Sequence, residues 1–330
     1  MRKSRAILPA LLVLCLVAAS VTANAQKRSY KIETVGSHDD EVLGVFVNDG
    51  DTKFATCSLD ETIKIWSLPD GNLLHTLTGH LAQVNHISFS GNDEMIASVS
   101  SDRTVRVWNV ADGSQMFTMR GHTAEVMGVY FSQDEESAFI ASGSFDGTVK
   151  LWDREFQSEV KTLRGHLLGV NSVAYSYDGK FIASGSDDHT VRIWSTDFDT
   201  KDALMTLRGH NAPVLAVLYS FDSKLLASAD QDGVIKIWSM PEGELMRSIN
   251  AHVELVQDVA FAADNRTLAS GSLDKNVKLW DVVTGENLMT KDVGVELWSV
   301  DLVSNANIIV MACADGSVRM MTEEASTGGR

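Results

Sequence analysis

The chain has 330 residues, of which 44% are hydrophobic and 22% are charged, a composition typical of globular proteins. It carries 44 acidic against 28 basic residues, a formal net charge of −16. This acidity argues against nucleic acid and anionic lipid as partners, because both require a basic face. The three cysteines are too few for a disulfide framework or a structural zinc site.

Residues 1–25 have the layout of a secretory signal peptide. Basic residues precede the apolar run Ala6–Ala19, and Ala23-Asn24-Ala25 fits an A-x-A cleavage site. The run is shorter than the roughly 20 residues of a membrane span, so we expect cleavage before Gln26. An uncleaved anchor and a misread start codon are the alternatives. No other segment approaches a span. We therefore expect a secretory, extracellular or periplasmic protein if the leader is used, and a cytoplasmic one otherwise.

Residues 26–36 follow the leader and precede the first repeat. The segment YKIETVGSH at 30–38 matches the run that stands before later GH dipeptides, such as EVKTLRGH at 159–166. It therefore predicts a strand over residues 29–35. The partner of this strand depends on the repeats that follow.

Residues 37–322 contain a repeated row of four polar and aromatic residues. A histidine recurs every 42 to 44 residues, with a Ser or Thr, an Asp and a Trp at fixed offsets after it. Such a period predicts a repeat architecture. The rows are His38, Thr56, Asp60, Trp66; His80, Ser98, Asp102, Trp108; His122, Ser142, Asp146, Trp152; His166, Ser184, Asp188, Trp194; His210, Ser228, Asp232, Trp238; and His252, Ser270, Asp274, Trp280.

Each unit reads as a set of short strands. In TVKLW at 148–152 the apolar residues alternate with other residues, and Asp-Gly pairs such as 146–147 mark hairpin turns. A GH dipeptide, a strand bearing serine, an Asp turn and a strand ending in Trp-Asp resemble the WD-repeat family. Within that family, the HDD order at 38–40 and the short seventh unit slightly resemble the WD-repeat subunit of the Ski complex.

The resemblance implies an all-β fold, a seven-bladed β-propeller of four-stranded antiparallel blades. The seventh unit has lost its row, with Val293, Met311 and Met321 at the His, Ser and Trp positions. It lacks an outer strand, because only a polar tail, residues 323–330, follows it; we expect that tail to be disordered. The N-terminal strand is therefore expected to complete blade seven and close the ring.

The Ser, His and Asp of each row are also the residue types of a hydrolase triad. A triad needs one site with an exposed nucleophile and an oxyanion hole, whereas six copies occur and the sequence has no G-x-S-x-G elbow. The resemblance implies instead a buried chain in which Trp donates to Ser, Ser to His and His to Asp. We interpret the rows as structural and expect no catalytic residue, no metal site and no cofactor.

Positions that vary between units are candidates for binding a partner. Those one before the Asp and five after the His change from unit to unit while the row repeats, and exposed apolar residues mark interaction sites. Burial between blades is the alternative for several of them, Trp298 included. The predicted partner-binding rim is Met127, Phe145, Asn171, Asp187, Leu215, Gln257, Leu273 and Trp298.

These expectations favour a non-enzymatic scaffold, a monomeric propeller that binds other proteins within a larger complex. A secreted or periplasmic propeller that binds a peptide or small ligand at the channel mouth is the alternative. Cys57 and Cys313 fall in neighbouring blades and could bond, although packed sheets lie too far apart for most disulfides. Asn265-Arg266-Thr267 is a glycosylation sequon if the host is eukaryotic.

Overall fold

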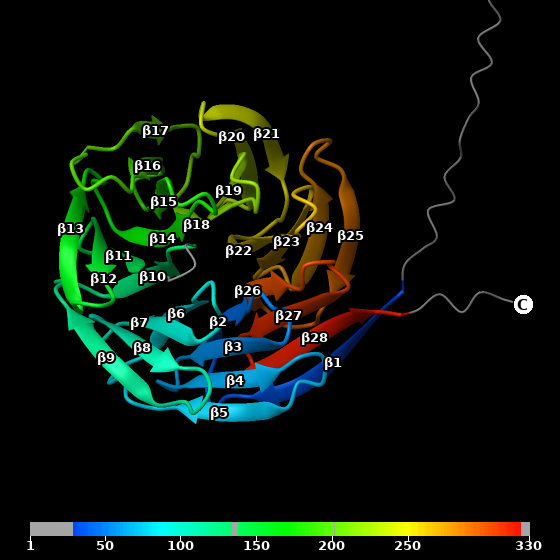
Figure 1. The fold of residues 1–330 in the computed structure, drawn as a ribbon. Helices are drawn as coiled ribbons and strands as arrows, with labels where there is room; N and C mark the ends of the chain where they lie inside the picture. Colours follow the sequence, from blue (N-terminus) through cyan, green and yellow to red (C-terminus); the bar gives the residue numbers. More distant parts are fainter. Residues whose placement is uncertain (1–28, 134–137, 201, 325–330) are drawn as a thin grey trace, which may run out of the picture.

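The computed structural model describes residues 29–133, 138–200 and 202–324. The expected signal peptide, residues 1–25, and most of the expected tail, residues 325–330, lie outside the described residues. Seven four-stranded antiparallel sheets form a closed ring around a central channel (Figure 1). This confirms the predicted all-β, seven-bladed propeller.

The strands follow the period of two in the sequence, and each blade runs from its innermost strand outward. In chain order they are β1 (Tyr30–Ser37), β2 (Val42–Val47), β3 (Lys53–Ser58), β4 (Ile63–Ser67), β5 (Leu73–Leu77), β6 (Val84–Phe89), β7 (Met95–Ser100), β8 (Thr104–Asn109), β9 (Gln115–Arg120), β10 (Val126–Phe131), β11 (Phe139–Ser144), β12 (Thr148–Asp153), β13 (Ser158–Arg164), β14 (Val170–Tyr175), β15 (Phe181–Ser186), β16 (Val191–Ser195), β17 (Met205–Leu207), β18 (Val214–Tyr219), β19 (Leu225–Asp230), β20 (Val234–Ser239), β21 (Glu244–Asn250), β22 (Val256–Phe261), β23 (Thr267–Ser272), β24 (Asn276–Asp281), β25 (Asn287–Asp292), β26 (Leu297–Leu302), β27 (Ile308–Cys313) and β28 (Ser317–Glu323).

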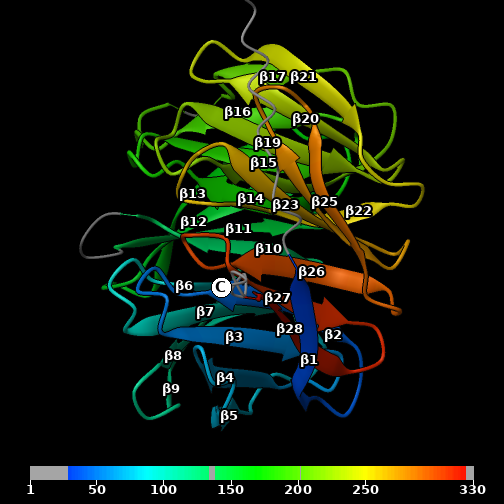
Figure 2. The ribbon, with the colours of Figure 1, turned by 90° about the vertical axis from the view of Figure 1, so that its right-hand side faces the viewer.

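The ring closes through the N-terminal strand. β1 pairs with β28 along its whole length, from Tyr30 opposite Glu323 to Ser37 opposite Ser317 (Figure 2). The strand therefore starts one residue later and ends two residues later than the expected range, 29–35. Closure pairs the edge of β28, which would otherwise offer unpaired backbone groups to other chains.

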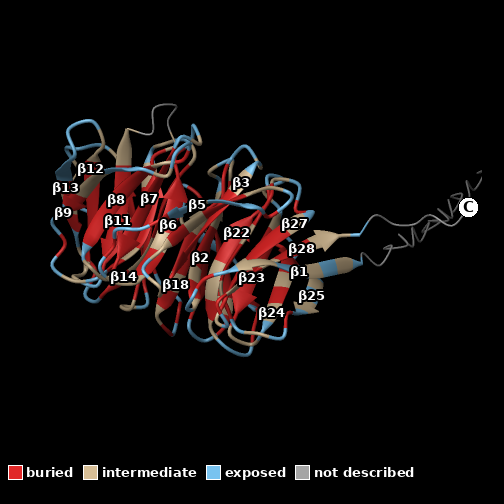
Figure 3. Cartoon of the chain, turned by 90° about the horizontal axis from the view of Figure 1, so that it is seen from below, coloured by how far each residue is buried: buried red, intermediate tan, exposed pale blue. Residues whose placement is uncertain are grey.

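The core lies between neighbouring blades, and the loops at both ends of the channel carry most of the exposed residues (Figure 3). Blade seven shows how a repeat without the polar row remains packed. Met311 and Met321 are completely buried and Val293 nearly so. Because all three replacements are apolar, no buried donor or acceptor is left without a partner at these positions.

Every innermost strand has a β-bulge after its first residue. In β2 the register shifts between Val42 and Gly44, and the six other innermost strands shift at the equivalent place. A bulge leaves its extra residue outside the ladder and turns its side chain to a new direction. The bulged residue is in each case the one five positions after the His or its replacement, so five predicted rim residues occupy bulges: Met127, Asn171, Leu215, Gln257 and Trp298.

Candidate functional site

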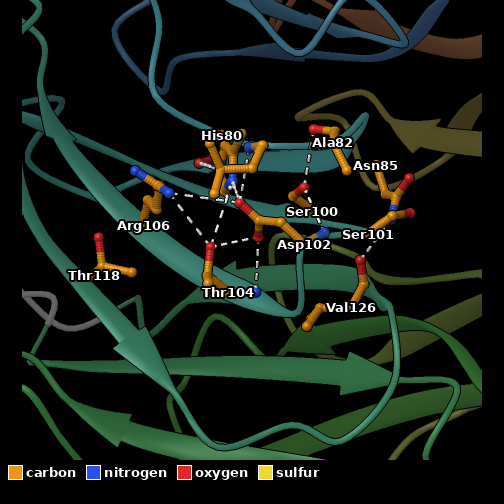
Figure 4. Close-up of polar contacts among 12 residues, drawn as sticks. His80, Ala82, Asn85, Ser100, Ser101, Asp102, Thr104, Arg106, Thr118 and Val126 are labelled. Carbon is orange, nitrogen blue, oxygen red and sulfur yellow. Dashed lines mark hydrogen bonds and ion pairs between the residues drawn. The ribbon is translucent and has the colours of Figure 1, made fainter.

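In the row of blade two, Asp102 lies between His80 and Thr104 (Figure 4). Trp108 Nε1–H donates to Ser98 Oγ at 2.8 Å, and that hydroxyl lies 2.7 Å from His80 Nε2. His80 Nδ1 lies 2.9 Å from Asp102 Oδ2. These contacts fit a neutral imidazole that accepts from Ser98 and donates to Asp102. Ser98 is completely buried and uses its hydroxyl on both sides.

Four further rows repeat this geometry. In the rows built on His38, His122, His166 and His252, the three contacts measure 2.8–3.0 Å. Ser142 in blade three is completely buried between Trp152 and His122. A serine in this position has no path to a substrate, which supports the structural interpretation of the row.

The prediction of Asp232 in the row of blade five was wrong. His210 Nδ1 lies 2.6 Å from Asp230 Oδ2, while Asp232 is exposed and donates its own N–H to Asp230 Oδ1. The equivalent position in the other five rows is a serine whose hydroxyl accepts from the turn, as Ser100 does from the Asp102 N–H. In blade five a carboxylate stands there instead, and it caps the turn and also reaches the histidine.

The row of blade two is arranged to keep its histidine neutral and its aspartate ionised. Burial lowers the pKa of His80, and the hydrogen bond with Asp102 only partly opposes this. Burial raises the pKa of Asp102, but hydrogen bonds from His80 and Thr104 outweigh it and hold the pKa below its ordinary value. Neutral imidazole and ionised carboxylate are the states that the hydrogen bonds require.

Five of the six rows also fix the backbone of the residue that follows the histidine. Asp188 Oδ2 accepts the N–H of Leu167 at 3.0 Å in addition to its contact with His166. Asp102 does the same for Leu81, which follows His80. The side chains of these following residues project to solvent: Leu167 is 84% exposed. Three rows thus anchor an apolar side chain, that of Leu81, Leu167 or Val253, on the loops at one end of the channel.

These residues were missed in the sequence, where only positions one before the Asp and five after the His were considered. Leu81, Leu167 and Val253 each stand directly after a repeating histidine and are among the most exposed apolar residues described. The sequence did carry a signal for this position, because it varies between units while the histidine before it repeats. It holds Leu, Val, Asn, Thr or Asp.

Phe145 and Leu168 extend this apolar surface across two blades. Phe145, on the β11–β12 turn, is 42% exposed, and Leu168, before β14, is 55% exposed. A Cβ added to Gly169 would lie 2.6 Å from Phe145 Cδ1, so the phenyl ring of Phe145 packs directly on the loop that precedes β14. Phe145, Leu167 and Leu168 are called the blade 3–4 patch below.

The other predicted rim residues are placed differently. Met127, Leu215, Gln257, Leu273 and Trp298 are half-buried, and Trp298 Nε1 has no hydrogen-bond partner among the described residues. Asn171 donates to Asp187 Oδ1 at 2.7 Å and to Val214 O of the next blade at 3.0 Å. The structure brings Asn171 and Asp187 together as a bridge between blades, whereas Phe145 presents a free face.

The described part of the chain shows no cluster of metal ligands and no disulfide. It contains no group of three or more His, Cys, Asp or Glu side chains that could hold a metal ion. Cys57 and Cys313 are both buried as free thiols. Within residues 29–133, 138–200 and 202–324, no helix is long and apolar enough to cross a membrane.

Comparison with known families agrees with the repeat register. The family model described as "WD domain, G-beta repeat" matches six segments: 29–67, 71–109, 113–153, 157–195, 201–239 and 243–281. Together they cover more than half of the chain. The chain belongs to the WD-repeat family. Each matched WD repeat begins with the outer strand of one blade and continues into the next blade, so the first match includes β1.

One similar protein is an uncharacterized WD repeat-containing protein, sll1491, from Synechocystis sp. (strain ATCC 27184 / PCC 6803 / Kazusa). It is 38% identical over 60 residues, which cover 18% of this chain and 17% of that protein. The similarity is therefore local, and the matched WD repeats assign no subgroup within the family.

Proposed function

We propose that this WD-repeat propeller is a non-enzymatic scaffold that binds other proteins through the blade 3–4 patch. The observation that carries the proposal is the pair of strongly exposed leucines, Leu167 and Leu168, beside the exposed ring of Phe145. Exposed apolar clusters of this kind are typical of protein interaction sites, and aromatic residues are common anchors.

The anchoring of the patch supports the same proposal. Asp188 holds the backbone of Leu167 and the ring of His166, and His166 is held in turn by Ser184. A loop whose backbone is already fixed loses little backbone freedom when a partner covers it, so less of the binding free energy is lost to ordering the loop.

The absence of catalysis is part of this proposal. In five of the six rows the aspartate is the turn residue, in the sixth it is Asp230, and the serine of blade three that could act as a nucleophile is buried under Trp152. The signal-peptide pattern of residues 1–25 supports a second element of the proposal, export of the chain. N-terminal sequencing of protein from the native source tests export, with Gln26 as the expected first residue.

Co-purification from the native source tests the patch. The variant Leu167→Ser/Leu168→Ser removes its most exposed groups, and the control variant Leu245→Ser/Leu288→Ser removes exposed leucines from the outer strands β21 and β25. The patch variant is expected to lose its partner proteins by at least about tenfold, and the control is expected to retain them. Equal recovery with both variants would place the binding face elsewhere.

A further inference from the structure

The loops that carry the repeating histidines, called the GH loops below, lie at one end of the channel. The channel contains a cavity at its opposite end. Its volume is about 330 Å³, and it is lined by the innermost strands and by the turns that leave them, such as β2–β3 and β14–β15. Small-molecule sites in proteins begin at roughly this size. The cavity lies at the other end of the channel from the blade 3–4 patch, so a ligand in it does not depend on the proposed protein-binding face.

Carboxylates line this cavity without basic partners. Asp258 on β22, Asp301 on β26, and Asp49 and Asp51 in the β2–β3 turn contribute to its wall, and no Lys or Arg stands among the described lining residues. His86 on β6 also lines it, but burial lowers the pKa of this histidine to about 4, so it is neutral at physiological pH. The wall therefore offers no positive side chain to pair with these carboxylates when they ionise.

Backbone groups hold two of these carboxylates in place. Asp301 accepts the N–H of Val47 at 2.7 Å and that of Leu302 at 2.8 Å, and Asp258 accepts the N–H of Val259 at 2.8 Å and the hydroxyl of Ser299. Burial nevertheless raises the pKa of Asp258 to about 7 and that of Asp301 to about 8. Burial and the neighbouring Asp93 and Asp51 raise the pKa of Asp49 to about 6.

Aromatic rings form the rest of the wall. Phe46 and Tyr130 meet edge to face with ring centroids 5.7 Å apart, and Tyr177 and Phe221 lie 4.6 Å apart. Such faces attract cations when water is excluded. Tyr219, only 1% exposed, also lines the cavity, and its hydroxyl has no hydrogen-bond partner among the described residues.

The same wall does not suit a metal ion. Among the described residues no three carboxylates or imidazoles converge to ligand distance. The cavity is also far larger than a bare ion and has aromatic sides. We propose that the channel cavity binds a small organic cation with an apolar body, in which Asp258 and Asp301 face the charge and the aromatic rings enclose the rest.

Calorimetric titration of the purified full chain tests this proposal with three probes of similar size. Benzyltrimethylammonium carries a permanent positive charge, benzyl alcohol is neutral and benzoate is negative. The cation is expected to bind at least tenfold more tightly than either of the other two. No measurable binding of the cation at millimolar concentration, or equal binding of benzyl alcohol, would overturn the proposal. These comparisons use the wild-type chain alone and need no variant to fold.

The pH dependence gives a second readout. A cation favours ionised Asp258 and Asp301, so its affinity is expected to rise about tenfold or more from pH 6 to pH 8.5, with protons released on binding near pH 7. The other ionisable groups that face these carboxylates are Asp49, Asp51, His86 and the tyrosines 130, 177 and 219. An affinity that stays constant over this range would contradict the assignment.

Substitutions then locate the site. Asp258→Asn and Asp301→Asn are each expected to weaken binding of benzyltrimethylammonium at least tenfold at pH 8.5. The matched control, Asp70→Asn, changes an exposed aspartate in the β4–β5 turn and is expected to leave binding unchanged. Binding that is lost in none of the cavity variants would place the cation elsewhere on this acidic protein and overturn the assignment to the channel.

Discussion

At the scale of single residues, the rows and the channel use buried polar groups in opposite ways. In the rows every donor meets an acceptor, as in Trp108–Ser98–His80–Asp102. In the channel Asp258 and Asp301 are half-buried with no basic side chain on the cavity wall, and their pKa values rise to about 7 and 8. The rows therefore stabilise the fold, whereas the channel carboxylates destabilise it in their ionised form.

Removing the serine of one row is expected to lower the stability of the fold and to abolish no catalytic activity. Ser142→Ala removes the partner of both Trp152 Nε1–H and His122 Nε2, which stay buried. Unsatisfied buried groups cost about 1–3 kcal/mol each, so the loss of both partners is expected to lower the free energy of unfolding by about 2–6 kcal/mol. Denaturant unfolding measures this, with the exposed Ser158→Ala as control. A serine-reactive fluorophosphonate is expected to label neither protein; labelling of Ser142 in the folded wild type would contradict the structural interpretation.

The raised pKa of Asp301 predicts how stability depends on pH. In the unfolded chain this carboxyl ionises near pH 4, but in the fold it stays protonated up to about pH 8. The folded state therefore loses stability as pH rises from about 4 to about 8, and keeps that loss above pH 8. Asp301→Asn removes this contribution. The melting temperature of Asp301→Asn minus that of the wild type is expected to increase from pH 5 to pH 9. The same difference for Asp70→Asn is expected to stay near zero. A constant difference across this range would show that Asp301 is not perturbed.

At the scale of strands, β1 decides whether the ring is closed. Its residues Tyr30 and Ile32 pack against the core of blade seven, and Gly36 lies against Trp66 of blade one, where an added Cβ would be 2.3 Å from the indole ring. β1 thus joins the last blade to the first as well as completing its sheet.

Deletion of residues 26–36 is expected to unfold or aggregate the protein, because β28 then presents an unpaired edge and the core of blade seven is uncovered. Size-exclusion chromatography and thermal melting measure this, with a chain lacking residues 325–330 as control. A synthetic peptide of residues 29–37 is expected to restore part of the lost stability. A monomer with a normal cooperative melt after the deletion would show that closure by β1 is dispensable.

The repeats explain what the sequence could predict at this scale. Residues that recur with a fixed spacing, such as His166 and Trp194, identify the blades and their order. Departures from the repeat were harder to place. Asp230 stands where other units have serine. Its hydrogen bond with His210 was therefore found only from the contacts in the structure. Asp258 and Asp301 each occur once, at positions where blade one has Gly44 and Phe46, so no pattern marked the channel carboxylates.

At the scale of the whole molecule, the ring has two distinct ends. One end carries the GH loops and the blade 3–4 patch, and the other opens into the acidic, aromatic cavity. Position in the blade decides how far a residue reaches into solvent. Met127 and Trp298 occupy bulges of the innermost strands and are half-buried, whereas Phe145 lies on a turn and is exposed. The two proposed activities therefore use separate surfaces and can be removed separately.

Site-specific photocrosslinking tests the central claim, that the GH end binds a protein partner, most directly. A photoreactive side chain is placed at Leu167 in the patch or at Leu288 on the outer strand β25, which is also strongly exposed. The account predicts discrete crosslinked proteins from position 167 in the native source and none of these from position 288. Crosslinks of the same proteins from both positions, or from position 288 alone, would contradict it.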